Sequence, residues 1–311
     1  MEELNRSGVL IVDKPAGVTS QDAVNIVRRL YGTRQVGHTG TLDPMATGVL
    51  PVLVGRAVKA SEYLLAENKR YQARLKLGLT TDTEDTDGKI LSVCSVLPGA
   101  EEVARVCASV TGEQRQVPPM YSALKRNGKK LVDLARAGIT VEREPRLISI
   151  YELNVRTVDE AAGLYELDVL CSKGTYIRSL CRDIGAALGC GGVMAGLRRT
   201  ASGPFGTDCA HTLGELESMT EAERAALLLP LERLFEDLPA LRLPPFYRRL
   251  SSSGCAIDLK KLGADLPDGR NVRLYDGDLF YALGRVQKTE EGRAVRAVKQ
   301  FVLFDKDGKP C

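Results

Sequence analysis

Apolar positions along the chain fall into short runs and alternating stretches, with amphipathic segments between them. Residues 8–13 are almost entirely apolar and end at a Lys-Pro-Ala-Gly breaker, which predicts a buried strand followed by a turn. Thr19 and Asp22 then form the T-x-x-D signature of a helix start, and apolar residues recur at 23, 24, 27 and 30. This second pattern predicts a helix that Gly32 ends.

The middle of the chain mixes the strand and helix periods. Residues 50–54 have the pattern of a strand, and residues 56–66 that of an amphipathic helix carrying Lys59. From Tyr71 to residue 79 apolar and polar positions alternate, which predicts a half-buried strand whose chain turns at Asp87-Gly88. Further helices are predicted at 100–111, 129–137 and 175–188, and strands at 89–93, 146–156 and 164–171. This irregular order indicates an α+β fold with a mixed, largely antiparallel sheet flanked by helices.

The last third of the chain holds an acidic helical segment and, after it, a segment with strand patterns. Residues 211–238 are acidic with a helical pattern, and three prolines at 239, 244 and 245 follow them. Beyond the prolines, short alternating runs are separated by Asp-Gly and Glu-Gly turns, which is typical of a small β-barrel. We therefore expect two domains, 1–238 and 239–311.

The composition is that of an ordinary soluble globular protein, with 44% hydrophobic and 27% charged residues. No apolar run is long enough to span a membrane, and the first residues lack a signal-peptide pattern. The eight cysteines are dispersed without a Cys-x-x-Cys pair, so we expect reduced thiols in a cytoplasmic protein. The two histidines are not spaced to bind zinc together with a cysteine.

The net charge of +3 is small, but the charges are unevenly distributed. Residues 121–150 carry seven Lys/Arg against three acids, and residues 241–311 carry fourteen against nine. Residues 211–240 have the opposite balance, seven acids against two bases. Two basic regions separated by an acidic connector fit contact with nucleic acid through patches. Taken one at a time, either region is also compatible with ordinary surface lysines.

The segment 37–50 is the richest in candidate chemistry. It holds one carboxylate, Asp43, with His38 five positions before it, a proline directly after it, and three glycines and three threonines around it. Such a backbone can approach a ligand closely, and loops commonly carry catalytic groups. On this segment alone, an ordinary Asp-Pro turn is the simpler interpretation.

Two patterns of cofactor binding are absent from the glycine-containing segments. The acidic cluster 81–88 fails as a calcium loop, because Thr83 and Cys94 would occupy its first and last ligand positions. It is better interpreted as a solvated hairpin turn. No Gly-Lys-Ser/Thr sequence closes a phosphate-binding P-loop. We therefore expect no metal and no organic cofactor.

The segment 172–178 places a tight glycine turn before a helix, so free backbone N–H groups lie close to Lys173, Tyr176 and Arg178. Such a site could hold phosphate, or Arg178 could form a fork with a carboxylate such as Asp43. A surface helix start with a structural arginine is the alternative. Tyr71, taken alone, has the pattern of a core aromatic residue.

Taken together, these segments closely resemble the bacterial tRNA pseudouridine synthase B (TruB) family. The similarity runs through about residues 8–230. The matching segments, in order, are 12–20, 37–50, 68–71, 116–123, 172–178 and 196–199. The resemblance implies an enzyme that isomerises uridine 55 in the T loop of tRNA to pseudouridine without cofactor or metal.

The resemblance also assigns roles to matched positions. Asp43 would be the catalytic aspartate, Tyr71 would pack on the target base, and Arg178 would be the salt-bridge partner of the aspartate. His38 would help to hold the flipped-out loop conformation. The further substrate-binding positions are Tyr176 and Leu197 in the uracil pocket, Lys59, and the insertion 121–146 over the T arm with Lys125, Arg126, Lys129 and Lys130.

The C-terminal barrel resembles a PUA RNA-binding domain more weakly, since Cys255 follows Gly254 where glutamine is common. We expect a monomer that binds the T arm of tRNA and needs neither a protein partner nor a membrane. Two alternatives stay open: a catalytic subunit that depends on a guide RNA, and a non-catalytic tRNA-binding chaperone. The basic insertion favours the stand-alone enzyme.

The residue types fit this chemistry. A base must leave its stack and enter an enclosed pocket before an enzyme can act on it. A carboxylate can then serve as nucleophile or as base, and the sequence leaves both possibilities open. An arginine beside Asp43 is expected to keep the carboxylate ionised at neutral pH.

Overall fold

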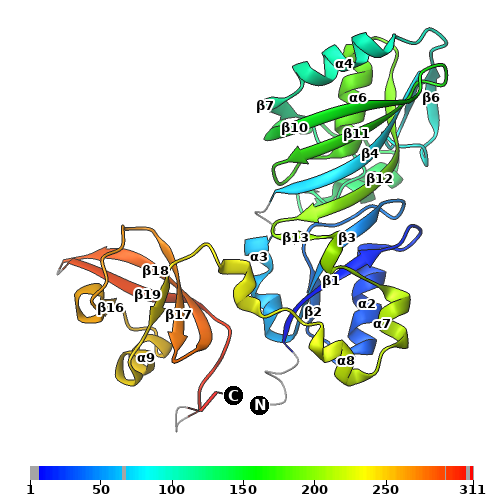
Figure 1. Ribbon diagram of the computed structural model, residues 1–311. Helices are drawn as coiled ribbons and strands as arrows, with labels where there is room; N and C mark the ends of the chain where they lie inside the picture. Colours follow the sequence, from blue (N-terminus) through cyan, green and yellow to red (C-terminus); the bar gives the residue numbers. More distant parts are fainter. Residues whose placement is uncertain (1–6, 65–67, 291, 306–308, 311) are drawn as a thin grey trace.

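The protein is built on two β-sheets that lie at opposite ends of the molecule in the computed structural model (Figure 1). The structure describes residues 7–64, 68–290, 292–305 and 309–310. The larger sheet has ten strands, in the order β14-β1-β3-β12-β4-β11-β10-β7, with β2 beside β3 and β13 beside β12. Its pairs are antiparallel except β1–β14 and β3–β12. The predicted α+β fold with a mixed, largely antiparallel sheet is confirmed.

The strands of this sheet are β1 Gly8–Lys14, β2 Val36–His38, β3 Thr47–Val54, β4 Lys69–Leu77, β7 Gly112–Gln116, β10 Arg146–Asp159, β11 Leu164–Cys171, β12 Gly192–Ser202, β13 Phe205–Gly206 and β14 His211–Thr212. The helices around it are α2 Ser20–Leu30, α4 Ala100–Ser109, α6 Ile177–Ala187, α7 Leu213–Ser218 and α8 Glu221–Ala226. Figure 1 shows α2 with α7 beside β1, and α4 with α6 at the other half of the sheet.

The first helix illustrates how local sequence sets the fold. Thr19 caps α2 by accepting from the backbone N–H of Asp22, whose carboxylate accepts from the Thr19 backbone in return. The side chains that α2 buries, Ala23, Val24 and Val27, join the main core beneath the sheet. Gly32 follows the helix with φ +61°, the left-handed conformation that ends helices.

Three expectations between the larger elements need correction. Residues 56–66 were expected to form one helix, but a 3-10 helix, Gly55–Ala60 (η1), is followed by the four-residue α3, Ser61–Leu64; residues 65–66 lie outside the described part. The predicted helix 129–137 begins later, at Leu131 (α5, Leu131–Arg136). The acidic connector is only partly helical: α7 and α8 are one to two turns long, and Leu231–Phe235 (η3) is 3-10.

The second sheet has five strands in the order β15-β17-β18-β19-β16. They are β15 Ala240–Arg242, β16 Ile257–Asp258, β17 Asn271–Asp276, β18 Leu279–Thr289 and β19 Gly292–Gln300, with α9 (Pro245–Ser252) against them. The predicted C-terminal barrel is thus present as a curled half-barrel around a core of its own.

The two sheets are joined by an aromatic cluster. Phe235 of η3 stacks on Phe301 at 5.9 Å between ring centroids, and Tyr63 meets Phe235 edge-on at 5.3 Å. Phe280 and Tyr275 complete the cluster from β18 and β17. Because these buried and partly buried rings come from both parts of the chain, burial of apolar surface stabilises the C-terminal sheet against the rest of the protein.

Candidate active site

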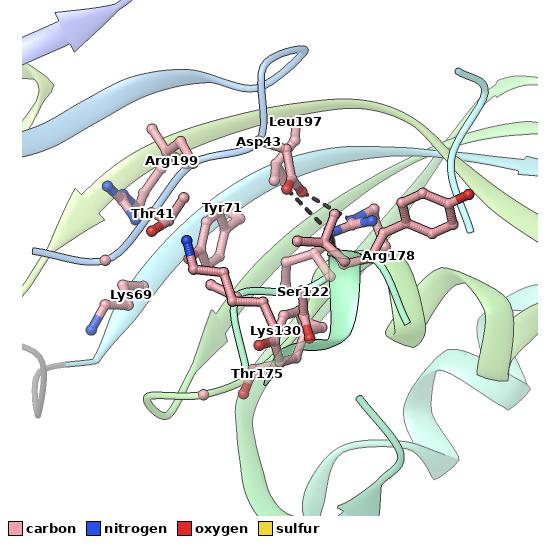
Figure 2. A pocket seen from close by; sticks show the side chains of 18 residues that line it. Thr41, Asp43, Lys69, Tyr71, Ser122, Lys130, Thr175, Arg178, Leu197 and Arg199 are labelled. Carbon is pink, nitrogen blue, oxygen red and sulfur yellow. Dashed lines mark hydrogen bonds and ion pairs between the residues drawn. The ribbon is translucent and has the colours of Figure 1, made fainter. Parts of the chain in front are cut away.

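A cavity of about 460 Å³ lies where β4, β12 and the start of α6 meet the loop before β3 (Figure 2). Asp43 enters it from that loop, Tyr71 from β4, and Arg178 from the first turn of α6. The remaining charged side chains of its lining are Lys69, Lys130 and Arg199. The cavity therefore unites residues that are far apart in the sequence.

The loop that carries Asp43 is fixed by hydrogen bonds on both sides of the carboxylate. Ser20, at the start of α2, donates to the carbonyl of Leu42 and accepts from its N–H. The buried Lys14 donates through Nζ to the carbonyls of Pro15, Val18 and Pro44. Burial lowers the pKa of Lys14 to about 8, although the charge of Asp43 opposes this effect. The backbone around Asp43 is thus held in place by hydrogen bonds within the protein.

Asp43 and Arg178 form a two-point ion pair. Arg178 Nε lies 3.0 Å from Asp43 Oδ2, and Nη2 donates to Oδ1 at 3.1 Å. Arg178 also donates to the carbonyls of Thr83 and Tyr121, at 3.1 and 2.8 Å. The arginine is buried, whereas 34% of the Asp43 side chain is exposed to the cavity. This is the fork that the sequence left as one of two possibilities for Arg178.

The pKa of Asp43 is raised from its ordinary value. Burial is the largest cause, and the like charge of Asp85 adds to it, while Arg178 and Lys14 act in the opposite direction. The expected lowering by Arg178 is therefore present but is outweighed by burial. The carboxylate is more basic than an exposed aspartate, which suits a group that takes up a proton or attacks carbon.

The turn 81–88 was expected to be a solvated hairpin turn. It does join two paired strands, Leu79–Thr81 (β5) and Ile90–Val93 (β6), and Asp87 is exposed, but the expectation is wrong for two of its acids. Glu84 and Asp85 are buried beneath α6. Ser179 donates to Glu84 at 2.6 Å, Arg182 also pairs with Glu84, and Asp85 lies 3.7 Å from Arg178. Arg178 and Arg182 are four residues apart on one helix and so face the same acidic turn. That spacing of two arginines was the available signal in the sequence.

The structure places Tyr176, Leu197 and Lys130 in the lining of the cavity, together with Asp43, Tyr71 and Arg178. His38 is not among the described lining residues: it ends β2, paired with Val52, and its Nδ1 is buried. Burial, with the charge of Arg199, lowers the pKa of His38. His38 therefore belongs to the sheet beside β3, and not to the described lining of the cavity.

The predicted basic residues divide into two groups. Lys125 and Arg126 (β8) pair with Lys129 and Lys130 (β9) in a two-stranded hairpin, and all four are exposed. This hairpin reaches the cavity through Lys130. Lys59 lies elsewhere, because its Nζ donates to the carbonyl of Gln300 in β19 at 3.1 Å. Its visible role is to link η1 to the C-terminal sheet.

The described part of the chain offers neither a clustered metal site nor a membrane-spanning helix. Within residues 7–64, 68–290, 292–305 and 309–310, no three His, Cys, Asp or Glu side chains gather as they would around a metal ion. No helix in the same ranges is both long and apolar enough to cross a membrane.

Sequence comparison places two family models on the chain. Residues 28–177 match the N-terminal domain of TruB family pseudouridylate synthases, and residues 178–236 match the tRNA pseudouridylate synthase B C-terminal domain. A protein of Alkaliphilus oremlandii named tRNA pseudouridine synthase B is 41% identical over 303 residues, covering 97% of this chain and all of the relative. One of Dechloromonas aromatica with the same name is 50% identical over 232 residues, covering 75% of this chain and 77% of the relative.

Structural comparison gives a consistent result. The chain superposes with a TM-score of 0.70 on a protein in the archaeal box H/ACA sRNP Nop10–Cbf5 complex, at 26% identity, covering 97% of this chain and 88% of the other. A Cbf5–Nop10–Gar1 complex contains a chain with the same TM-score at 27% identity, covering all of this chain and 89% of the other. The similarity thus spans both sheets.

Proposed function

This chain belongs to the TruB family of pseudouridylate synthases, and we propose that it converts uridine 55 in the T loop of tRNA to pseudouridine at the cavity around Asp43. It is an enzyme that isomerises uridine to pseudouridine in tRNA, as its relatives' names indicate. The single observation that carries the proposed site is the two-point ion pair of Asp43 with Arg178 inside a cavity that Tyr71 also lines.

The chemistry needs few parts. The bond from C1′ of the ribose to N1 of uracil breaks, a bond from C1′ to C5 forms, and the proton of C5 is replaced by one on N1. No atoms are gained or lost, so no co-reactant is needed. Asp43 acts at the sugar or the ring as nucleophile or base, Arg178 fixes the direction of its lone pairs, and Tyr71 packs on the flipped base.

The RNA chain is held outside the cavity. The β8–β9 hairpin presents Lys125, Arg126 and Lys129 to solvent directly beside the cavity residue Lys130. Exposed cations in this place suit the phosphates of the T arm, and such contacts supply most of the affinity of a nucleic-acid-binding surface. We propose that this hairpin with α5, within the insertion 121–146, closes over the T arm.

We also propose a division of labour between domains 1–238 and 239–311. All residues of the cavity precede residue 200, whereas the C-terminal half-barrel carries an excess of basic residues. The half-barrel would then be a PUA-like domain that contacts RNA away from the target nucleotide. The protein is proposed to act alone, as a cytoplasmic monomer.

Incubation of the purified protein with an unmodified tRNA transcript, followed by mapping of pseudouridine, tests this proposal. We expect multiple turnover and one modified position, 55, without added guide RNA and in the presence of chelator. Modification only with a guide RNA would favour the ribonucleoprotein subunit. Tight binding with no pseudouridine would favour the chaperone.

A further inference from the structure

Arg199 is a buried cation whose terminal nitrogens have no carboxylate or carbonyl partner in the described part of the protein. Its side chain is inaccessible to solvent, and its Nε donates to the carbonyl of Val49 at 2.6 Å. The two terminal nitrogens, Nη1 and Nη2, are buried and donate to no carboxylate or backbone carbonyl of the described residues. Burial of donors without acceptors is costly, so such a group suggests a functional constraint.

The location of Arg199 suggests which group it serves. In the antiparallel pair of β4 and β12, Arg199 lies directly opposite Tyr71, so both side chains point to the same face and line the same cavity. Figure 2 shows both on the side of Asp43 away from Arg178. A Cβ placed on Gly40 would lie 3.2 Å from Nη1, so the loop before Asp43 closes over the guanidinium.

The charged and titratable groups that act on the Tyr71 phenol are Arg199, Cys171 and Asp43. Burial raises the pKa of Tyr71, and the positive charge of Arg199 and a side-chain hydrogen bond with it oppose that rise. A guanidinium has five N–H donors and no acceptor. When it donates to the phenol oxygen, the phenol proton must therefore point away from it.

We propose that Arg199 is a positioning residue that acts through Tyr71, holding the phenol oxygen so that its hydroxyl proton points at the base in the cavity. The inference rests on the proposed function, because Tyr71 must face the target base. Arg199 touches no substrate in this proposal. It sets the orientation of a group that does.

The experiment is a double-mutant cycle measured by single-turnover formation of pseudouridine at saturating tRNA. Arg199→Gln is made in the wild-type enzyme and in the Tyr71→Phe enzyme. We expect at least about a tenfold slowing with Tyr71 present, with unchanged tRNA affinity. In the Tyr71→Phe background the same substitution should change the rate by less than about twofold, because the hydroxyl on which Arg199 acts is gone.

Two further variants serve as controls for the cycle. Arg199→Lys keeps the charge but not the fork, and should recover part of the rate. Arg198→Gln removes the neighbouring arginine, which pairs with Asp13 away from the cavity, and should leave the rate unchanged. Equal slowing by Arg199→Gln in both backgrounds would assign Arg199 to the scaffold and overturn the proposal.

The proposal also stays testable if no Arg199 variant folds. Full activity of the Tyr71→Phe enzyme would show that no hydroxyl needs positioning. Absence of pseudouridine with the wild-type protein would instead reject the proposed function itself.

Discussion

Arg178 holds both carboxylate oxygens of Asp43, with Nε 3.0 Å from Oδ2 and Nη2 3.1 Å from Oδ1. The two residues are 135 positions apart, and the same guanidinium also ties down the carbonyls of Thr83 and Tyr121. Because four acceptor sites are satisfied by one buried side chain, the direction of the Asp43 carboxylate is fixed before substrate arrives. A bidentate fork gives this directional control, which a lysine could not supply.

Replacing Asp43 with asparagine should abolish turnover and spare RNA binding. The amide keeps the size of the side chain but loses the negative charge that attack or proton abstraction requires. Affinity comes mainly from contacts of Lys and Arg with phosphate and from stacking, so it should be retained or improve as repulsion of the RNA backbone falls. Filter binding and single-turnover assays on one preparation measure both.

The matched control is Arg178→Lys, which keeps the carboxylate but loses the fork. We expect this variant to be slow rather than inactive. Multiple turnover by the Asp43→Asn protein, after deamidation has been excluded by mass spectrometry, would make Asp43 a structural turn residue.

The loss of activity at low pH should depend on Asp85. Since the pKa of Asp43 is raised by burial and by Asp85, activity should be lost as pH falls through a value above that of an ordinary aspartate, about 3.9. Asp85→Asn removes the like charge, so the pKa of Asp43 should fall and activity should be lost at a lower pH. The rate at neutral pH should also fall, because Arg178 loses one of its anionic neighbours.

The stability of the protein should depend on pH in the opposite direction to its activity. A carboxyl whose pKa is raised by folding stabilises the protein below its unfolded-state pKa, and this contribution is lost as pH rises through the folded-state value. Asp85→Asn should therefore make the melting temperature depend less on pH between the unfolded-state and the folded-state pKa of Asp43. Asp87→Asn, in the same turn but exposed, is the control, and an equal shift with both variants would rule out a specific effect of Asp85.

The contrast between Asp22 and Asp85 shows what the sequence could predict. The role of Asp22 depends on Thr19, three residues away, so the capping box was predicted from the sequence and is confirmed. Asp85 and Glu84 meet partners on α6 more than ninety residues later, and a polar turn does not indicate which helix will cover it. The contact of Lys59 could not be predicted for the same reason, since its acceptor, the carbonyl of Gln300, lies 241 residues further along the chain. Short-range patterns gave the α+β class and the candidate loop, but tertiary pairing decided which charges are buried.

Tyr71 should separate stacking from hydroxyl chemistry. Tyr71→Phe keeps the ring against the base, so tRNA should bind nearly as well while the rate falls by roughly 10²-fold or more if the hydroxyl takes part in proton transfer. Tyr71→Ala should impair both binding and rate, since base–aromatic stacking contributes about 1–3 kcal/mol. Equal rates for Tyr and Phe would leave the residue as a stacking platform alone.

Replacing Lys59 and replacing Lys129 should affect different properties of the protein, although both are exposed lysines. Lys59→Ala removes a hydrogen bond to β19, so we expect faster proteolysis near residues 236–240 and an unchanged rate on a T-arm stem-loop. Lys129→Ala should weaken tRNA binding and lower the slope of log affinity against log salt by about one contact. Weaker binding of the stem-loop by the Lys59→Ala protein would show that Lys59 contributes to RNA binding.

Gly48 should be one of the least replaceable residues of the site's scaffold. It has φ +101°, a conformation that side chains with a Cβ rarely adopt, and a Cβ built there lies 2.1 Å from the carbonyl oxygen of Arg199. Since β3 and β12 pair at this point, relief of the clash would separate the strands that carry the loop of Asp43 and the side chain of Arg199.

Gly48→Ala should therefore lower the free energy of unfolding by about 2–6 kcal/mol, the sum of backbone strain and overpacking. Urea unfolding beside Gly214→Ala provides the comparison, because Gly214 lies in α7, where an added Cβ would meet no atom within 4 Å, and the variant should gain up to about 1 kcal/mol. Gly48→Ala should also lose activity at temperatures where it remains folded, since Asp43 and Arg199 would shift together. An alanine at this position with wild-type stability and rate would mean that the β3–β12 junction is not the rigid support on which the cavity depends.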